Sequence, residues 1–332
     1  MPQQVRMRKQ AASLDFSANN RVSEPLARGF LYRELYLRLT GQLTVSIANN
    51  TAAKTLRGDE WALIRKVELI ANGTDVIKSI DGNALWWLNF FKYGAAPKTT
   101  ALLADGATAN PAFDSVLILP IWMPRSVKPL DTALDSSKLS SLEIVITFGD
   151  HTSINASATG FTTTPRVDVS SLESFNPGGN LTTSSWRNFT IEKEITASNS
   201  RFQVQLPVGK MFRSFMINTT DAGVDQGDIM TNLKLISGTT VFADLSCGDD
   251  VLHQVSRLRT GTLQSVSRRG TPNDNAGWYH LDLVTDGFLT EAIDTLGFSE
   301  FLLEADVTVG GGSTKMVIYP DEIVPVRGNV NG

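Results

Sequence analysis

The sequence VELIANGTDVI, from Val67 to Ile77, returns in altered form as LKLISGTTVF, from Leu233 to Phe242. With one gap, both stretches read as a strand, a tight turn that contains glycine and a second strand. Asn72-Gly73 is the dipeptide that a type I′ turn prefers, because both central residues of that turn need a positive φ. The two stretches therefore predict two related β-hairpins.

Matching segments continue around these hairpins in one order, and each hairpin runs into a predicted short helix, at 81–92 and at 249–258. The matched positions are Gly73 with Gly238, Asp131 with Asp294, Gly149 with Gly310 and, upstream, Phe30 with Phe212. The first three pairs are 161 to 165 residues apart and the upstream pair 182, which indicates an insertion of about 17 residues near 43–59. We interpret the pattern as a duplication; two unrelated β domains with similar turns are the alternative.

Strand patterns dominate the rest of the chain. Apolar residues alternate with polar ones in short runs bounded by turn residues, which is typical of half-buried strands. Such runs lie at Leu35–Thr40, Ile64–Leu69, Leu142–Phe148 and Leu303–Val309. We predict an all-β fold of two tandem eight-stranded jelly rolls, with short helices in loops. The expected boundaries are an N-terminal arm at 1–24, a first jelly roll at 25–175, a linker at 176–190 and a second jelly roll at 191–332.

Composition excludes several classes of protein. The chain has 332 residues, 42% of them hydrophobic, which is enough for a sizeable core and argues against general disorder. A formal net charge of −4 argues against a protein whose main task is to bind nucleic acid, and we expect no sequence-specific contact with it. One cysteine, Cys247, makes neither an internal disulfide nor a cysteine-based zinc site. No run of about 18 apolar residues suggests a membrane span, and residues 1–10 lack the apolar core of a signal peptide.

Catalytic patterns are scarce. The three histidines, His151, His253 and His280, lie far apart, whereas a metal-dependent bicupin needs clustered ligands. The glycine run at 310–315 lacks the order of a phosphate-binding loop, so a hairpin turn is the preferred interpretation. The acidic stretch at 221–228 lacks EF-hand spacing. We therefore predict no catalytic, cofactor-binding or metal-binding residues and no enzymatic activity.

Two features are candidates for contacts with partners. Arg6, Arg8 and Lys9 form a short basic segment that could face lipid head groups or phosphates; a solvated terminus is the alternative. The other candidate is an aromatic cluster on the first predicted helix, which is either packed in the core or partly buried by another subunit. The cluster consists of Trp86, Trp87, Phe90 and Phe91.

The duplicated hairpin and helix resemble those of double jelly-roll major capsid proteins from tailless icosahedral viruses, above all membrane-containing, corticovirus-like bacteriophages. The resemblance rests on a pattern that spans most of residues 25–326. In the second copy the pattern is LPVGK at 206–210, a strand at 212–217, Leu233–Gly238 and Asp249–Leu252; in the first it is Pro25, Phe30, Val67–Gly73 and Leu85–Leu88. The insertion near 43–59 departs from it.

The resemblance implies a virion protein, synthesised in the host cytoplasm, that works by self-assembly. Three copies would form a homotrimeric, pseudo-hexagonal capsomer, and capsomers would tile an icosahedral shell around the genome. The implied partners are other copies of the chain, minor capsid or vertex proteins and an internal lipid membrane, with the basic residues of the arm at the base. Low charge, 19% of residues, fits lateral faces that meet neighbours, because unpaired charges there would cost desolvation free energy.

A second class of function stays open. A two-domain β spike protein that binds glycans or receptors would also be rich in strands. Such proteins stack exposed aromatic rings on sugars, so open grooves at Trp61, Trp122 or Trp278 would favour it. A metal-dependent bicupin enzyme is the third alternative.

Overall fold

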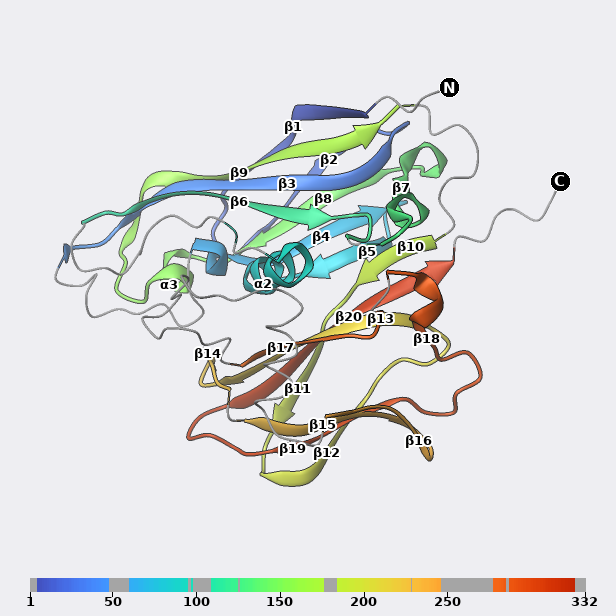
Figure 1. Cartoon of the computed structure of the whole chain (residues 1–332). Coiled ribbons are helices and arrows are strands. Elements are labelled where there is room, and N and C mark those ends of the chain that lie inside the picture. The colour runs from blue at the N-terminus through green and yellow to red at the C-terminus, as the bar shows by residue number, and fades with distance from the viewer. Residues whose placement is uncertain are drawn as a thin grey trace. The chain divides into compact units, whose positions relative to one another are not determined.

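A computed structural model describes residues 5–47, 60–94, 97, 109–124, 126–175, 184–227, 229–245, 277–284 and 287–325. Strands dominate this part of the chain, and it divides into two compact units (Figure 1). The body of the first unit runs up to Arg187, and the body of the second runs from Asn188 to Val324. No helix among the described residues is long and apolar enough to cross a membrane.

The first unit contains two antiparallel sheets. One has the order β1 (Val5–Asp15), β9 (Gly160–Ser174), β3 (Leu31–Thr44) and β6 (Ala112–Pro120), with the short β7 (Leu134–Asp135) on β3. The other has the order β2 (Arg21–Pro25), β8 (Leu142–Phe148), β4 (Ile64–Ala71) and β5 (Asp75–Ile80), followed by β10 (Ser184–Asn188). The described helices of the first unit are η1 (Glu60–Leu63), α2 (Gly82–Tyr93), η2 (Pro129–Thr132), η3 (Ser136–Lys138) and α3 (His151–Ile154).

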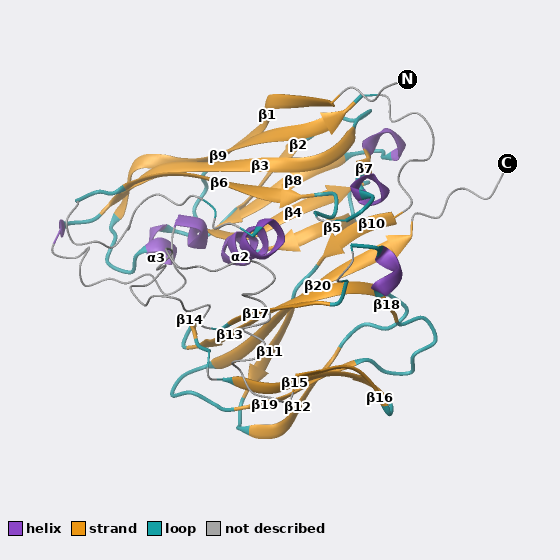
Figure 2. Ribbon diagram, viewed as in Figure 1, coloured by secondary structure: helices purple, strands orange, loops and turns teal. Residues whose placement is uncertain are grey.

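The second unit repeats this arrangement (Figure 2). One sheet has the order β11 (Ile191–Ile195), β20 (Thr314–Pro325), β13 (Met211–Asp221) and β17 (Trp278–Asp282), with the short β14 (Val224–Asp225) and β18 (Ile293–Asp294) on β13. The other has the order β12 (Asn199–Gln205), β19 (Leu302–Val307), β15 (Met230–Ser237) and β16 (Thr240–Leu245). The helical turn η4 (Leu289–Glu291) precedes β18.

Both units are eight-stranded jelly rolls. When the eight long strands of a unit are numbered along the chain, one sheet has the order 1-8-3-6 and the other 2-7-4-5, in both units. The chain thus crosses repeatedly between two sheets that face each other across a core. The predicted fold class is confirmed.

The alternating sequence pattern explains where each core sits. In β3 the inward side chains of Leu35, Leu37 and Leu39 have no exposed surface, whereas Arg38 between them is exposed. In the second unit the core contains stacked and tilted rings of Phe212, Phe215 and Phe301, with centroids 5.3 to 6.2 Å apart. Burial of such alternating apolar faces is the main term that stabilises a sandwich of two sheets.

The two hairpins share an irregularity. The pairing of β4 with β5 shifts between Leu69 and Ile70, and the pairing of β15 with β16 shifts between Leu235 and Ile236, at the matching position. Asn72 and Gly73 both have positive φ, 53° and 78°, as predicted. The first turn has three residues between the paired Ala71 and Asp75, so it is longer than a two-residue type I′ turn. A shared bulge supports one origin for both hairpins.

The first predicted helix is confirmed as α2. The Asp81 carboxylate accepts a hydrogen bond from the Ala84 backbone N–H at 2.8 Å, which caps the helix, and Gly94 follows its end with a φ of 71°. The second predicted helix, at 249–258, lies outside the described residues.

The hydroxyl groups of Ser136 and Thr295 correct the alignment of the two copies. The Ser136 hydroxyl donates to the Phe30 carbonyl at 2.7 Å and accepts from the Phe30 N–H at 3.1 Å. The Thr295 hydroxyl donates to the Lys210 carbonyl at 2.7 Å and accepts from the Lys210 N–H at 2.9 Å. Asp294 therefore corresponds to Asp135 rather than to Asp131. The first copy contains both LDT at 130–132 and LDS at 134–136, and sequence could not decide between them.

A similar correction applies to β8 and β19. The Leu142 carbonyl accepts from the Leu26 N–H at 2.8 Å, and the Phe301 carbonyl accepts from the Leu206 N–H at the same distance. Leu142 therefore corresponds to Phe301, two residues before the match that the sequence suggested. Strand patterns repeat every two residues, so an error of two leaves the pattern of apolar positions intact.

The structure changes the boundary of the predicted N-terminal arm and shows which connection contains the predicted insertion. Residues 5–15 and 21–24 of the expected arm lie in strands β1 and β2, so these strands of the segment belong to the first jelly roll. The predicted insertion falls in the connection that leaves β3 at Thr44, and the corresponding connection, from Asp221 to Met230, is shorter. Residues 48–59 of the insertion and 176–183 of the predicted linker lie outside the described residues.

Candidate assembly surfaces

Arg6 and Arg8 are held by one buried carboxylate. Both lie on β1, where Arg6 is paired across the strands with Glu173 of β9. The Arg6 Nε contacts Glu173 Oε1, and the Arg8 Nη2 lies 3.2 Å from the same oxygen. The Glu173 side chain has no exposed surface, whereas Arg6 and Arg8 keep 35% and 26%. The structure thus places two of the three predicted basic residues in an internal charge cluster.

Aromatic rings complete this cluster. The Arg6 guanidinium carbon lies 4.4 Å from the centroid of Phe30 and 4.3 Å from that of Phe175, and the two rings meet edge to face. A cation over aromatic faces is stabilised by the ring quadrupole. Lys9 is exposed and has no ion pair with any residue that the structure describes. A contact with lipid or phosphate stays a prediction, and Lys9 is the member of the trio best placed for it.

The aromatic cluster of α2 is part of the core. Trp86, Trp87, Phe90 and Phe91 are 1%, 5%, 2% and 1% exposed in the single chain. Their rings contact one another at centroid distances of 5.0 to 6.2 Å. Side chains that are already buried offer little surface to another subunit, so the core interpretation is the one that burial favours.

Asn89 joins α2 to β6. Its amide nitrogen donates to the carbonyls of Leu85 and Ile118 at 2.8 and 2.6 Å, and its amide oxygen accepts from the Ile118 N–H at 2.8 Å. β6 is the end strand of its sheet, so Asn89 satisfies backbone groups that no neighbouring strand pairs. Sequence analysis missed this residue, although a lone amide between tryptophans and phenylalanines was a usable signal.

The end of the four-stranded sheet in the first unit is covered by β10. Arg187 of β10 makes a bidentate ion pair with Asp75 of β5, with Nη1 and Nη2 2.6 and 2.9 Å from the two carboxylate oxygens. The Lys78 ammonium of β5, which is fully buried, lies 3.4 Å from the centroid of the Trp186 ring. Bidentate and cation–π contacts together fix β10 on β5.

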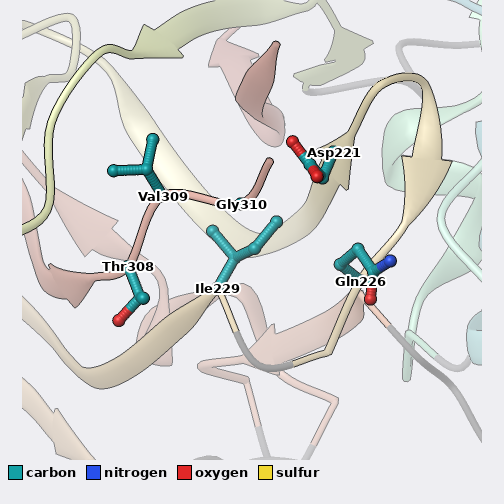
Figure 3. A pocket seen from close by; sticks show the side chains of 6 residues that line it. All are labelled: Asp221, Gln226, Ile229, Thr308, Val309 and Gly310. Carbon is teal, nitrogen blue, oxygen red and sulfur yellow. The ribbon is translucent and has the colours of Figure 1, made fainter. Parts of the chain in front are cut away.

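A small pocket of about 160 Å³ lies in the second unit, lined by Asp221, Gln226, Ile229, Thr308, Val309 and Gly310 (Figure 3). The Asp221 carboxylate accepts hydrogen bonds from the Gly312 N–H at 3.0 Å and from the Thr314 hydroxyl at 3.0 Å. The acidic group therefore holds the glycine-rich turn. That turn links β19 to β20, which belong to different sheets, so it is not the expected hairpin turn.

Possible catalytic or metal-binding groups are dispersed. No cluster of three or more histidine, cysteine, aspartate or glutamate side chains occurs within the described ranges. Asp225 of the acidic stretch accepts hydrogen bonds from Asn218 and from the Trp278 indole at 3.2 and 3.1 Å. His253 and Cys247 lie outside the described residues. The carboxylates of Asp221 and Asp225 therefore hold neighbouring groups of the second unit in place.

Exposed apolar side chains gather on two strands that end sheets. β1 ends the sheet that it forms with β9, β3 and β6, and it carries Val5 and Met7, 49% and 65% exposed. β16 ends the four-stranded sheet of the second unit and carries Val241 and Phe242, 52% and 37% exposed. Unpaired edges with apolar side chains are templates for pairing with another chain. They are the strongest candidates for assembly surfaces in the described structure.

Comparisons with known proteins rest on structure. No family model matches the sequence, and no curated protein matches it. The major capsid protein of Sulfolobus Turreted Icosahedral Virus matches with a TM-score of 0.73 and 11% identity, over 97% of each chain. That of bacteriophage PM2 matches with a TM-score of 0.66 and 14% identity, over 98% of this chain and 99% of that one. The Faustovirus major capsid protein matches with a TM-score of 0.57 and 8% identity, over 98% and 90%.

Proposed function

We propose that the chain is the major capsid protein of an icosahedral virus with a double jelly-roll coat. The observation that carries the proposal is a likeness over nearly the full length of both chains, 97–99%, to coat proteins from viruses such as Sulfolobus Turreted Icosahedral Virus and bacteriophage PM2. A likeness that spans almost the whole of both chains suggests that the proteins share one task. That task is self-assembly, which requires no bond-making chemistry.

The proposed assembly has two stages. Three copies form a pseudo-hexagonal capsomer, because each copy supplies two similar units, and capsomers then pack laterally into a shell around the genome. The low charge of 19% and the open edges at β1 and β16 support surfaces that meet other copies. We extend the proposal to minor capsid or vertex proteins and to an internal membrane near Lys9.

Buried tryptophans count against a glycan-binding spike. Trp61 and Trp278 have 0% and 1% exposed surface. Trp122 is half-buried, and its indole N–H donates to Glu34 at 3.0 Å. A sugar-stacking platform needs open ring faces, and none of these three residues offers a fully open one.

Native mass spectrometry of the purified chain tests the proposal. We expect a species of three times the 36.1 kDa chain mass, and we expect the chain to be the most abundant protein of the particles that contain it. A strictly monomeric chain that never enters particles would contradict the proposal. Binding to a glycan array together with low copy number in virions would support the spike instead.

A further inference from the structure

The first strand of each unit has a counterpart in the other. The end of β1 pairs with β9, from Ala12 opposite Val169 to Asp15 opposite Arg166. β11 pairs with β20 in the same way, with Ile195 opposite Thr314. Both are the first strand of a jelly roll and pair with the last strand. Arg166 of β9 pairs with Thr40, and Lys315 of β20 pairs with Thr220, the counterpart of Thr40 on β13, so Asp15 corresponds to Glu194, 179 residues further on.

The match continues into β10 across an irregularity that both units share. The pairing of β1 shifts between Arg8 and Ala12, and at the corresponding place β10 ends at Asn188 and β11 begins at Ile191. With Arg8 matched to Asn188, the irregularity is one residue shorter in the second unit, and residues 5–8 correspond to residues 185–188 of β10. The burial agrees: Trp186 and Asn188 are buried, as their counterparts Arg6 and Arg8 are in part, whereas Val5 and Met7 face solvent.

The two units differ in what covers the end of the four-stranded sheet. In the first unit β10 lies on β5 and is fixed there by the Arg187–Asp75 ion pair. The counterpart of β5 is β16, which ends its sheet among the described strands. The counterpart of β10 is the first part of β1, which ends its own sheet on the far side from β3. Among the described strands, one copy thus has one sheet end that another strand covers (β5, covered by β10), one sheet end that no strand covers (β16) and one strand segment with an open edge (residues 5–8).

We propose that residues 5–8 of β1 in one copy pair with β16 of the next copy, so that the β10–β5 junction is repeated between chains. This inference rests on the proposed function, because it specifies how capsomer subunits join. In a ring of three chains the junction occurs six times, three times within chains and three times between them. The pairing covers the exposed Val5, Met7, Val241 and Phe242 and satisfies the backbone groups of both edges.

The matched positions predict which side chains meet. Met7 corresponds to Arg187, and Thr240 corresponds to Asp75, 165 residues earlier in the aligned hairpin. Where the junction within the chain has an ion pair, the junction between chains thus has the neutral pair Met7 and Thr240. A neutral pair avoids the desolvation cost that two charges would add to association.

Cysteine crosslinking tests the pairing. The variant carries Met7→Cys and Thr240→Cys in a Cys247→Ser background and is treated with a short bismaleimide at assembly concentration. We expect a covalent trimer as the limiting product, since each copy uses its residue 7 on one neighbour and its residue 240 on the other. The matched control replaces Met7→Cys by Val116→Cys, which is 42% exposed on β6, at the opposite end of the same sheet; it should remain monomeric on denaturing gels.

Native mass of the same sample separates this inference from the proposed function. A trimer in which positions 7 and 240 do not crosslink overturns the strand pairing and leaves the capsid function standing. Crosslinked trimers from a chain that never forms shells support the pairing and count against the shell. Hydrogen exchange on the unmodified chain gives an independent readout: amides of 5–8 and 240–245 should be at least tenfold better protected in the trimer than in dilute monomer, and equal exchange would overturn the pairing.

Discussion

At the scale of single residues, Glu173 shows how a buried charge is tolerated. Its carboxylate lies fully buried between β1 and β3 but meets two guanidinium groups and accepts a hydrogen bond from the Ser171 hydroxyl at 3.2 Å. When this carboxylate is removed, both guanidinium groups lose a strong hydrogen-bond acceptor.

We expect Glu173→Gln to lower the free energy of unfolding by about 2 kcal/mol, because two charge-assisted hydrogen bonds weaken. The measurement is the midpoint of chemical denaturation. Asp114→Asn is the matched control: it breaks the Arg38–Asp114 pair, in which both side chains are more than half exposed, and should change stability by less than about 1 kcal/mol. Equal effects of the two substitutions would refute the assignment.

Asp150 gives a prediction about pH. The Thr152 hydroxyl and the Asn19 amide donate to its carboxylate and lower its pKa to about 2 from 3.8. A lowered pKa in the folded state means that the carboxylate stabilises the fold above the ordinary pKa and that this contribution is lost as pH falls from about 4 to 2. Because Asp150 also caps α3, Asp150→Ala should cost about 1 kcal/mol at neutral pH.

The test is a series of denaturation curves between pH 7 and pH 2. The difference between wild type and Asp150→Ala should shrink over the last two pH units. Asp150→Asn keeps a capping side chain that does not titrate, so its cost should be smaller at neutral pH. Because neither variant titrates at this position, the difference in stability between Asp150→Asn and Asp150→Ala should stay constant with pH. A difference that stays constant down to pH 2 would refute the lowered pKa.

At the scale of elements, the hydrogen bonds of the Ser136 and Thr295 hydroxyls are equivalent in the two jelly rolls. Each fixes a short strand, β7 or β18, at the start of the long β3 or β13. Both hydroxyls are fully buried. Ser136→Ala and Thr295→Val should each destabilise the chain by about 1 kcal/mol, because each leaves a partly buried N–H and carbonyl with fewer partners.

Thermal unfolding followed by circular dichroism checks this pair. Ser137→Ala is the control, since the Ser137 hydroxyl donates to the Asp135 carboxylate in an exposed contact. A fall in melting temperature for only one of Ser136→Ala and Thr295→Val would show that these hydrogen bonds are not equivalent in the two units.

The elements themselves were largely predictable from sequence, and their registers were not. Alternating runs such as Leu142–Phe148 predict strands because one face is buried, and the Asn72-Gly73 turn predicts its own backbone. Alternation is blind to a shift of two residues, so the match of β8 with β19 was misplaced. The role of Asn89 could not be predicted, because it depends on a contact with Ile118 of β6, 29 residues further along the chain.

At the scale of the whole molecule, the duplication was visible because offsets between matched positions stay nearly constant. The candidate assembly surfaces were not visible. Whether Val5 or Val241 is exposed depends on which strand ends a sheet, and the order of strands in a sheet is set by tertiary pairing, such as that of Val5 with Ser174. The contact of Arg6 with Glu173 was not visible in the sequence either, since the two residues meet only when β1 pairs with β9.

An edge substitution tests the surfaces at this scale. Val241→Lys places a charge on β16, where it should leave the monomer folded and weaken trimer formation by at least tenfold, because lysine on an edge strand opposes pairing with another chain. Sedimentation velocity measures the trimer fraction across concentrations. Val116→Lys, on the end strand β6, is the control and should leave the trimer intact; a trimer that survives Val241→Lys would count against β16 as an interface.

Electron cryomicroscopy of particles that contain this chain tests the central claim most directly. We predict an icosahedral shell whose capsomers each resolve into three chains, with six jelly rolls around every capsomer and this chain fitting the density throughout. Particles whose shell is built from another protein, with this chain absent or confined to a few projecting spikes, would contradict the account.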